Sequence, residues 1–181
     1  MQAWRRLLIL VALCWAGGVR SQPVSGMSEA AVKAAFLLNF TNFVEWPANA
    51  FGAPGEPVVI AVIGDDEVYA ELERLAIGRR AAGRPFALLR LREATAQGRV
   101  HLAYIGPRRD ARLTETISAS EGPVLVVTQA PGALEMGAVI NFLTQDRRVR
   151  FEASVAEAQA RGLRLSARLL GVAVAVDGRP Q

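Results

Sequence analysis

The sequence predicts a single three-layer α/β domain, with a mostly parallel central sheet, helices on both faces and an antiparallel hairpin near the C-terminus. Residues 58–63 form a continuous β-branched run, typical of a strand buried on both faces, and apolar residues at helical spacing follow it. Further extended runs alternate with helical segments as far as residue 127, and two extended runs follow at 139–144 and 148–153. The chain has 181 residues, 51% of them hydrophobic, which is enough for one domain with a sizeable core.

The first 21 residues have the layout of a secretory signal peptide. Arg5 and Arg6 precede an apolar run over residues 7–16, and small residues follow it. A membrane span needs roughly 20 apolar residues, about twice this run, so we expect cleavage and not anchoring. We therefore expect residues 1–21 to be a signal peptide and residues 22–181 to be a secreted domain. Two residue pairs suit the cleavage site: Val19 with Ser21, or Ala16 with Gly18.

Charge and cysteine usage narrow the function classes. Of the 21 basic residues, Arg5, Arg6 and Arg20 lie in the expected leader, which leaves 18 against 17 acidic residues. Nucleic-acid binding usually needs a concentrated basic face, so this balance argues against a nucleic-acid partner. The one cysteine, Cys14, also lies in the leader. The secreted domain would thus enter an oxidising compartment without disulfides, and its core alone would stabilise it.

The longest apolar segment after the leader, residues 30–46, predicts a helix that ends at Pro47, which cannot continue it. One expected apolar face holds Val32, Ala35, Phe36, Phe40 and Phe43. The expected polar strip is narrow and holds Ala34, Thr41 and Glu45. A helix apolar nearly all round needs burial on more than one side. It is either a core helix of this domain or a helix partly covered by a second protein chain.

The remaining elements follow in order from residue 50. Two glycines and two prolines predict a loop over residues 50–57, and Gly64, Asp65 and Asp66 predict a turn and helix cap after the strand at 58–63. The following helix should end at Gly78. We expect further strands at 85–91, 100–105 and 123–127, a helix at 108–118, and a hairpin turn at 145–147. A short helix at 155–160, a strand at 163–165 and an apolar segment at 166–176, capped by Ser166, complete the prediction.

Catalytic and metal-binding residues are sparse. His101 is the only histidine and lies inside an apolar strand candidate, without a recognisable nucleophile motif or triad elsewhere in the chain. We expect a hydrogen-bonded core or rim histidine. One histidine and no cysteine outside the leader make a poor zinc ligand set, so we expect no metal, no cofactor and no enzymatic activity.

Three polar residues are candidates for ligand binding. Asp65 lies where the first strand meets its helix, a position at which open α/β sheets often bind ligands, but a helix cap is the simpler interpretation. Asn141 and Arg168 are polar residues within apolar blocks. They either satisfy backbone groups or line a pocket for a ligand or partner. The sequence leaves both alternatives open.

Six blocks of the chain resemble the YfiR family of periplasmic proteins. They are KAAFLLNFTNFVEWP (33–47), VIAVIGDD (59–66), GRPFALLRL (83–91), HLAYIG (101–106), VLVVTQAPGALEMGAVINFLTQDRRVRFEAS (124–154) and GLRLSARLL (162–170). The phenylalanine-rich segment ending in Trp-Pro, combined with the INF hairpin, is the more specific part of the resemblance. Some relatives carry cysteine pairs that this chain lacks, so disulfide gating is not expected of the secreted domain.

The resemblance implies a periplasmic α/β domain that dimerises. It also implies repression of an inner-membrane diguanylate cyclase through binding of the periplasmic sensor region of the cyclase, which would tune cyclic-di-GMP and biofilm formation. On this basis we expect an interface between chains built on Phe36, Phe40, Phe43 and Trp46, since aromatic residues anchor such surfaces. The alternative is a periplasmic sensor that binds a small ligand near Asp65, or around Asn141 and Arg168.

Overall fold

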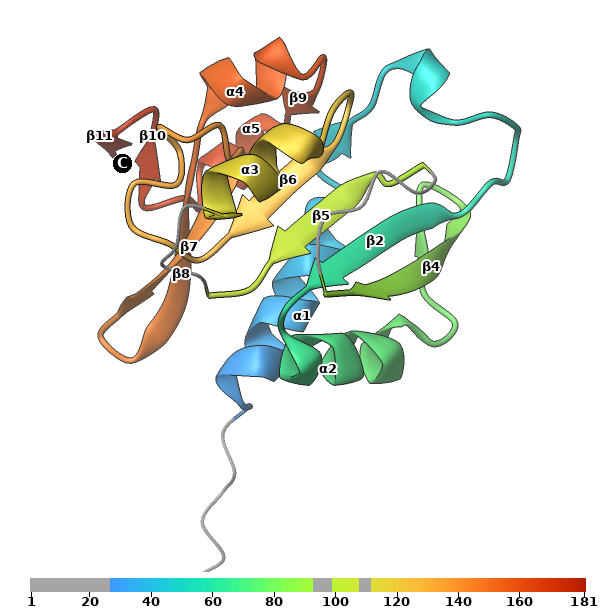
Figure 1. Cartoon of the computed structure of the whole chain (residues 1–181), viewed down its shortest axis with the longest axis horizontal. Helices are drawn as coiled ribbons and strands as arrows, with labels where there is room; N and C mark the ends of the chain where they lie inside the picture. Colours follow the sequence, from blue (N-terminus) through green and yellow to red (C-terminus); the bar gives the residue numbers. More distant parts are fainter. Residues whose placement is uncertain (1–26, 93–98, 108–111) are drawn as a thin grey trace, which may run out of the picture.

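The computed structural model describes residues 27–92, 99–107 and 112–181, which form the expected three-layer α/β arrangement (Figure 1). The expected signal peptide lies outside the described residues. The helices are α1 (Glu29–Phe40), the 3-10 helix η1 (Ala48–Ala50), α2 (Asp66–Ala76), α3 (Arg112–Ala119), α4 (Val155–Ala160) and α5 (Ala167–Leu170). The strands are β1 (Val44–Glu45), β2 (Val58–Ile63), β3 (Arg80–Ala81), β4 (Arg84–Leu91), β5 (Leu102–Ile105), β6 (Leu125–Thr128), β7 (Ile140–Gln145), β8 (Arg148–Ala153), β9 (Arg164–Leu165), β10 (Ala175–Val176) and β11 (Arg179–Pro180).

The main sheet is mostly parallel, as predicted. Its strand order is β11-β10-β8-β7-β6-β5-β2-β4-β3. The neighbours from β4 through β7 pair in parallel, and the β7–β8 hairpin is antiparallel. Asp146 and Arg147 form the hairpin turn with φ angles of 50° and 58°, which matches the left-handed geometry that two-residue hairpins use. The predicted hairpin is therefore confirmed, with a turn one residue shorter than expected.

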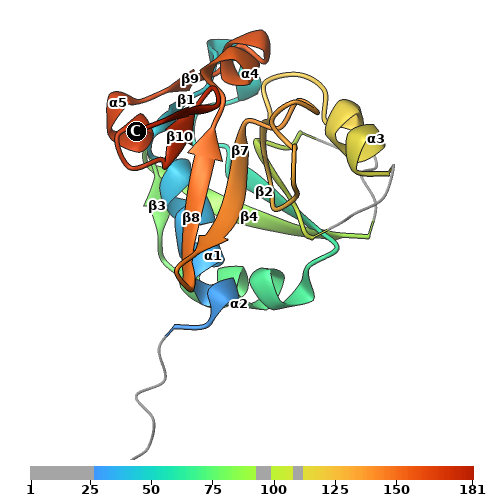
Figure 2. The ribbon, with the colours of Figure 1, turned by 90° about the vertical axis from the view of Figure 1, so that its left-hand side faces the viewer.

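Alternation along the strands separates two apolar layers. Ile60 and Val62 of β2 face a cluster to which α1, α2, α4 and α5 contribute, whereas Ile63 faces a second cluster. On the second face, α3 contributes Leu113 and Ile117. Figure 2 shows α1 and α2 together at one side of the sheet and α3 at the other. Helices thus lie on both faces, although α3 is the only helix among the described residues that packs on the second.

The chain reverses direction within the sheet between β2 and β5. From β2 it passes through α2 to β4 on one side, and from β5 through α3 to β6 on the other. Ligands often bind at such a switch point, in the crevice beyond the carboxyl ends of the strands. Here the two ends touch, because a Cβ atom at Gly106 would lie 2.8 Å from the Gly64 carbonyl oxygen. Close backbone approach therefore leaves no room for a side chain at position 106.

The first helix is shorter than predicted, and its expected orientation is wrong. It ends at Phe40, where the Thr41 hydroxyl donates to the Leu38 carbonyl (2.6 Å). Beyond it, Val44 enters β1 and pairs with β9, so residues 41–46 gain strand contacts that a longer helix would lose. The expected polar strip is largely inside, since Ala34 and Thr41 are buried. Of the expected apolar face, Phe40 is buried, and Phe36 and Phe43 are half-buried and pack against the core.

The C-terminal segment also differs from the prediction. Ser166 does cap a helix, because its hydroxyl accepts from the Leu169 N–H (3.3 Å), but α5 covers only four residues. The chain then turns, and Ala175 and Val176 of β10 pair in parallel with Glu152 and Ala153 of β8. This strand extends the sheet beyond the hairpin. Its two residues are too few for a periodic signal in the sequence.

Candidate functional site

Phe36 and Phe40 of α1 belong to an aromatic cluster with Phe142 of β7 and Phe151 of β8. The Phe40 ring lies 5.8 Å from Phe142 and 5.0 Å from Phe151, measured between ring centroids. Phe36 lies 6.0 and 5.7 Å from the same two rings. Phe40 is only 1% exposed, whereas Phe36 is half-buried. Phe40 is therefore a core residue of this fold, and Phe36 is the member of the pair that reaches the surface.

Phe43 and Trp46 lie beyond the helix, on either side of β1. The Phe43 carbonyl accepts from the Ser166 N–H (2.9 Å), which joins this segment to the start of α5. The Trp46 indole N–H donates to the His101 carbonyl (3.3 Å), and its ring contacts Phe51 edge to face. Both side chains are half-buried. The four aromatic residues therefore form two groups, and three of them, Phe36, Phe43 and Trp46, retain exposed surface.

Asp65 is a helix cap whose two carboxylate oxygens both accept hydrogen bonds. Oδ1 accepts from the Val68 N–H (3.0 Å) and Oδ2 accepts from the Tyr104 hydroxyl (3.1 Å). Tyr104 is buried, and this burial, together with the Asp65 charge, raises the pKa of its hydroxyl. A cavity of about 840 Å³ adjoins Asp65 and includes the ion-paired Asp66 and Arg90. The cap predicted from the sequence is confirmed, and both oxygens of the Asp65 carboxylate already accept a bond within the domain.

Asn141 bridges three segments through both the oxygen and the nitrogen of its carboxamide. Its Oδ1 accepts from the Ala130 N–H (3.0 Å), and its Nδ2 donates to Glu152 Oε1 of β8 (2.8 Å). Asn141 is 1% exposed and borders a cavity of about 600 Å³. Arg168 is exposed on α5 and is not among the described residues that line this cavity. The structure therefore does not bring Asn141 and Arg168 into one described pocket.

An ion pair between a buried lysine and an exposed glutamate at the start of α1 escaped the sequence analysis. Lys33, the only lysine of the chain, has a side chain that is 7% exposed and lies 2.6 Å from Glu29. The hydrogen bond from this lysine is the main cause that lowers the pKa of the Glu29 carboxyl, and Gln129 donates to the same carboxylate (3.4 Å). The spacing of Glu29 and Lys33 could have suggested the pair. Only the packing of α1 against the sheet buries the Lys33 side chain.

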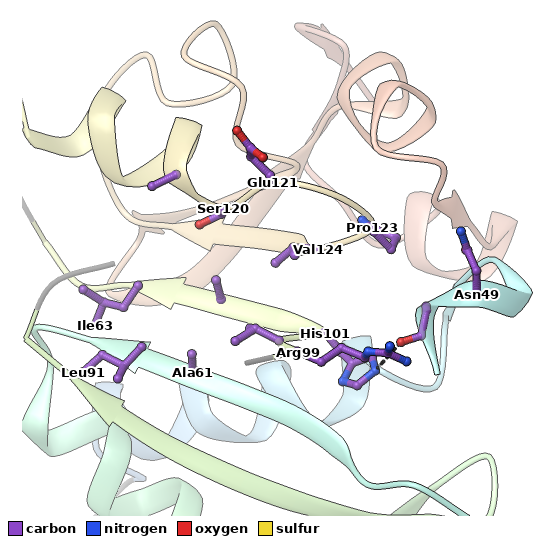
Figure 3. Close-up of a pocket in the computed structure, with 14 residues that line it drawn as sticks. Asn49, Ala61, Ile63, Leu91, Arg99, His101, Ser120, Glu121, Pro123 and Val124 are labelled. Carbon is purple, nitrogen blue, oxygen red and sulfur yellow. Dashed lines mark hydrogen bonds between the residues drawn. The ribbon is translucent and has the colours of Figure 1, made fainter. Parts of the chain in front are cut away.

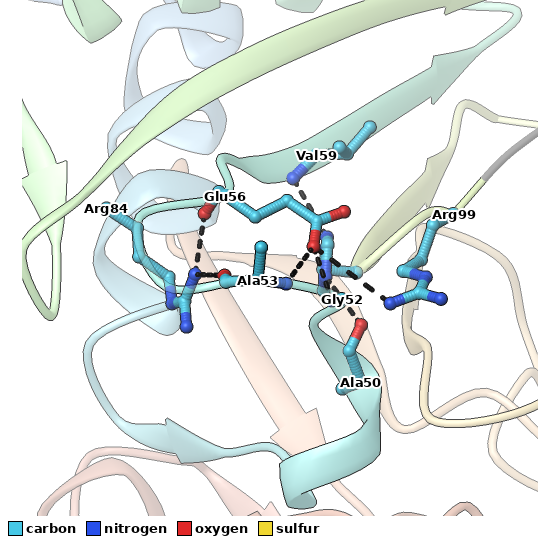
Figure 4. Close-up of polar contacts among 8 residues, drawn as sticks. Ala50, Gly52, Ala53, Glu56, Val59, Arg84 and Arg99 are labelled. Carbon is cyan, nitrogen blue, oxygen red and sulfur yellow. Dashed lines mark hydrogen bonds and ion pairs between the residues drawn. The ribbon is translucent and has the colours of Figure 1, made fainter.

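His101 holds the loop before β2 against the sheet, and Figure 4 labels two of its hydrogen-bonding partners, Ala50 and Val59. Its Nδ1 accepts from the Val59 N–H (3.0 Å), so the ring is neutral there and Nε2 donates to the Ala50 carbonyl (3.1 Å). Phe51 stacks on the imidazole at 4.3 Å, and the Arg84 guanidinium stacks on Phe51 at 3.9 Å. Burial is the main cause that lowers the pKa of His101 from its ordinary value of 6.5. The expected hydrogen-bonded core histidine is thus what the structure contains.

This geometry predicts a pH-dependent stability. Because the native pKa of His101 is below 6.5, the unfolded chain binds a proton more readily than the native protein at mildly acidic pH. The contribution to stability is complete above about pH 6.5 and is lost as the pH falls toward the lower native pKa. Urea unfolding between pH 7.5 and 5.5 should show a decrease in the free energy of unfolding of at most about 1.4 kcal/mol per pH unit.

The variant His101→Asn is the control for this prediction, because asparagine keeps a donor and an acceptor but does not titrate. Among the charged groups near the imidazole, Glu56 favours its protonated form, whereas Arg84 and Arg99 disfavour it. The variant should be less stable at every pH, but its free energy of unfolding should no longer decrease between pH 7.5 and 5.5 through this residue. An equal slope in both proteins would contradict the assignment.

Neither a metal-ligand cluster nor a helix able to span a membrane occurs among the described residues. Across residues 27–92, 99–107 and 112–181, histidine, cysteine and acidic side chains do not gather in threes to form a metal site. None of the helices in this part of the chain has the length and apolar character that crossing a bilayer requires.

The fold and these contacts define an α/β domain in which internal hydrogen bonds engage Asp65 and Asn141, and in which Phe36, Phe43 and Trp46 are half-buried. A family model described as YfiR/HmsC-like matches residues 30–174, and the chain belongs to this family. Members of the family are periplasmic regulators of diguanylate cyclases. A search of curated proteins found no match.

Proposed function

We propose that this protein is a non-enzymatic periplasmic regulator that binds the periplasmic sensor region of an inner-membrane diguanylate cyclase and represses it. The match to the YfiR/HmsC-like family over most of the chain carries this proposal. The side chains of Asp65 and Asn141 also support it, because both are hydrogen-bonded within the domain and serve as structural residues there. Export would depend on the expected signal peptide, residues 1–21. We also propose a homodimer, as the resemblance implies.

The half-buried aromatic residues are the proposed partner surface. Phe36 and Phe43 combine exposed area with firm support, since Phe36 packs on Phe142 and Phe151 and Phe43 is tied to Ser166. Aromatic side chains held in this way lose little conformational freedom on binding and are frequent anchors of interfaces. Trp46 extends the surface toward the loop before β2. Phe40 contributes from below, by supporting Phe36 at a ring distance of 5.7 Å.

Single charge substitutions test this surface. Phe43→Glu should weaken association with the cyclase by at least about 30-fold, because losing an anchor residue costs about 2 kcal/mol or more. Association is measured by capture of the cyclase from detergent-solubilised envelopes, and repression is measured as the cellular cyclic-di-GMP level. We expect less captured cyclase and a higher cyclic-di-GMP level in cells that carry the variant.

Ile77→Glu is the matched control, since Ile77 is 80% exposed at the end of α2, on a different element from the proposed surface. It adds the same charge and should leave capture and repression unchanged. Both variants must retain the secreted amount and thermal unfolding of the unmodified protein. Normal capture and repression by a folded Phe43→Glu protein would reject the surface. An unchanged cyclic-di-GMP level after deletion of the whole protein would reject the regulatory function itself.

A further inference from the structure

A cavity of about 630 Å³ lies on the second face of the sheet (Figure 3). Its floor consists of Ala61 of β2 and Ala103 of β5, and its apolar walls include Ile63, Leu91 and Val124. This volume falls within the range of about 300–1,000 Å³ that is usual for small-molecule sites, and a mostly apolar lining is also usual there. None of the residues considered above as ligand candidates lines it.

The cavity exists because the second face is only partly covered. On this face α3 packs through Leu113 and Ile117 with residues of β5 and β6, but no helix in the described part of the chain packs over β2 and β4. Parallel sheets normally have both faces covered, since both are apolar. The alanines of the floor, with Ala119 at the end of α3, leave room where longer side chains would fill the space. An apolar floor of this kind favours a ligand whose apolar part lies against it.

One cation lies at the mouth of the cavity. Arg99 has a side chain that is 51% exposed, and its ion pair with Glu56 is long, at 4.0 Å. The Glu56 carboxylate already accepts from the backbone N–H groups of Gly52 and Ala53, as Figure 4 shows. The guanidinium of Arg99 is therefore only weakly engaged. Arg84 nearby differs, because it donates to two backbone carbonyls and stacks on Phe51.

Apart from Asn49, the other polar residues at the rim are occupied or lie apart from Arg99. His101 uses both ring nitrogens, and the Ser120 hydroxyl donates to the Thr116 carbonyl (3.0 Å). Glu121 lies on the opposite rim, beside Ser120, and away from Arg99 (Figure 3). A ligand with one negative charge at the Arg99 end avoids this carboxylate. A phosphate monoester would bring about two charges to a single, half-exposed arginine and is a poorer fit.

We propose that this cavity binds a small apolar monocarboxylic acid. The ligand carboxylate pairs with the Arg99 guanidinium, whose planar N–H groups match a carboxylate in two-point geometry. The aromatic or aliphatic body of the acid lies over Ala61 and Ala103, and Ala119 bounds it from the α3 side. This site is independent of the proposed cyclase-binding surface, so either proposal can fail without the other.

Calorimetric titration of the purified protein with 3-phenylpropionate tests the site, with 3-phenylpropanol as the uncharged counterpart of the probe. We expect one saturable site with a dissociation constant of about 1 mM or lower for the acid, and affinity at least about tenfold weaker for the alcohol. Arg99→Gln removes the charge and should weaken the affinity for the acid by at least about tenfold. Ala119→Trp places a large side chain at the cavity wall and should abolish binding of both probes.

Arg147→Gln is the matched control, because Arg147 is an exposed arginine in the β7–β8 turn and does not line the cavity. This variant should bind the acid as the unmodified protein does. Arg99 and Ala119 are exposed, so the two test variants should fold normally, which circular dichroism checks. Absence of saturable binding by the unmodified protein overturns the proposal. Retention of full affinity by a folded Arg99→Gln or Ala119→Trp protein also overturns it.

Discussion

The variant Phe40→Ala should lose about 3–5 kcal/mol of the free energy of unfolding, which is the usual cost of removing a buried phenylalanine ring. Phe40 is 1% exposed and contacts the rings of Phe36, Phe142 and Phe151 within 6 Å between centroids. Its removal leaves a cavity between α1 and the hairpin that rigid neighbours cannot fill. Because globular proteins are stable by only about 5–15 kcal/mol, the loss is a large fraction of the total. Urea denaturation of the purified variant measures it.

Phe36→Ala is the matched control, since the same ring is removed from the same helix at a half-buried position. It should lower the free energy of unfolding clearly less than Phe40→Ala does, because water can occupy part of the vacated space. The two variants should also separate in the cyclase assay. Phe36→Ala should be secreted normally and bind the cyclase weakly, whereas Phe40→Ala should reduce the secreted amount. Equal losses of stability in both variants would show that Phe40 is not the more buried residue in solution.

Asn141→Leu should lower the free energy of unfolding by about 2–3 kcal/mol, although leucine is apolar and similar in size. The substitution leaves the buried Ala130 N–H without its acceptor, and a buried unsatisfied donor costs about 1–3 kcal/mol. It also removes the donor to Glu152, which links β7 to β8. The change is measured by urea denaturation at neutral pH. A bridging role predicts this loss without any added ligand.

Glu152→Gln is the matched control for the bridge. Glutamine retains a carbonyl oxygen that can accept from Asn141 Nδ2, so most of the stability should remain, with a loss below about 1 kcal/mol. Asn141→Leu with unchanged stability would show that the carboxamide is free in solution. Asn141 would then again be a candidate for ligand binding.

Much of the fold could be predicted from local sequence patterns. The β-branched run at 58–63 became β2 with the same bounds, and the helix at 155–160 became α4 without change. Asp65 and Ser166 cap helices through their own side chains, so the signal lies within three residues of the helix start. Each of these features depends on residues that are close neighbours in the chain. Such patterns can therefore be recognised without knowing the tertiary structure.

The end of α1 and the β1 strand could not be predicted in this way. Residues 41–46 still include Phe43, Val44 and Trp46, and Pro47 is the first obvious stop signal. What ends the helix earlier is the pairing of Val44 and Glu45 with Leu165 and Arg164, more than 100 residues further along the chain. The residue pattern within the segment gives no indication that β9 is its pairing partner. The same holds for Lys33, which is buried by the packing of its helix and not by its own chemistry.

The sequence by itself determined the α/β class, the order of the main elements, the helix caps and the family. The tertiary structure alone decided which aromatic residues form the core and which reach the surface, because Phe40 is buried by Phe142 and Phe151 from distant strands. It also decided that Asn141 bridges backbone segments and that Ala61, Ala103 and Arg99 surround one cavity. The physical reason is that burial depends on contacts between residues far apart in the chain, whereas caps and periodicity depend on neighbours.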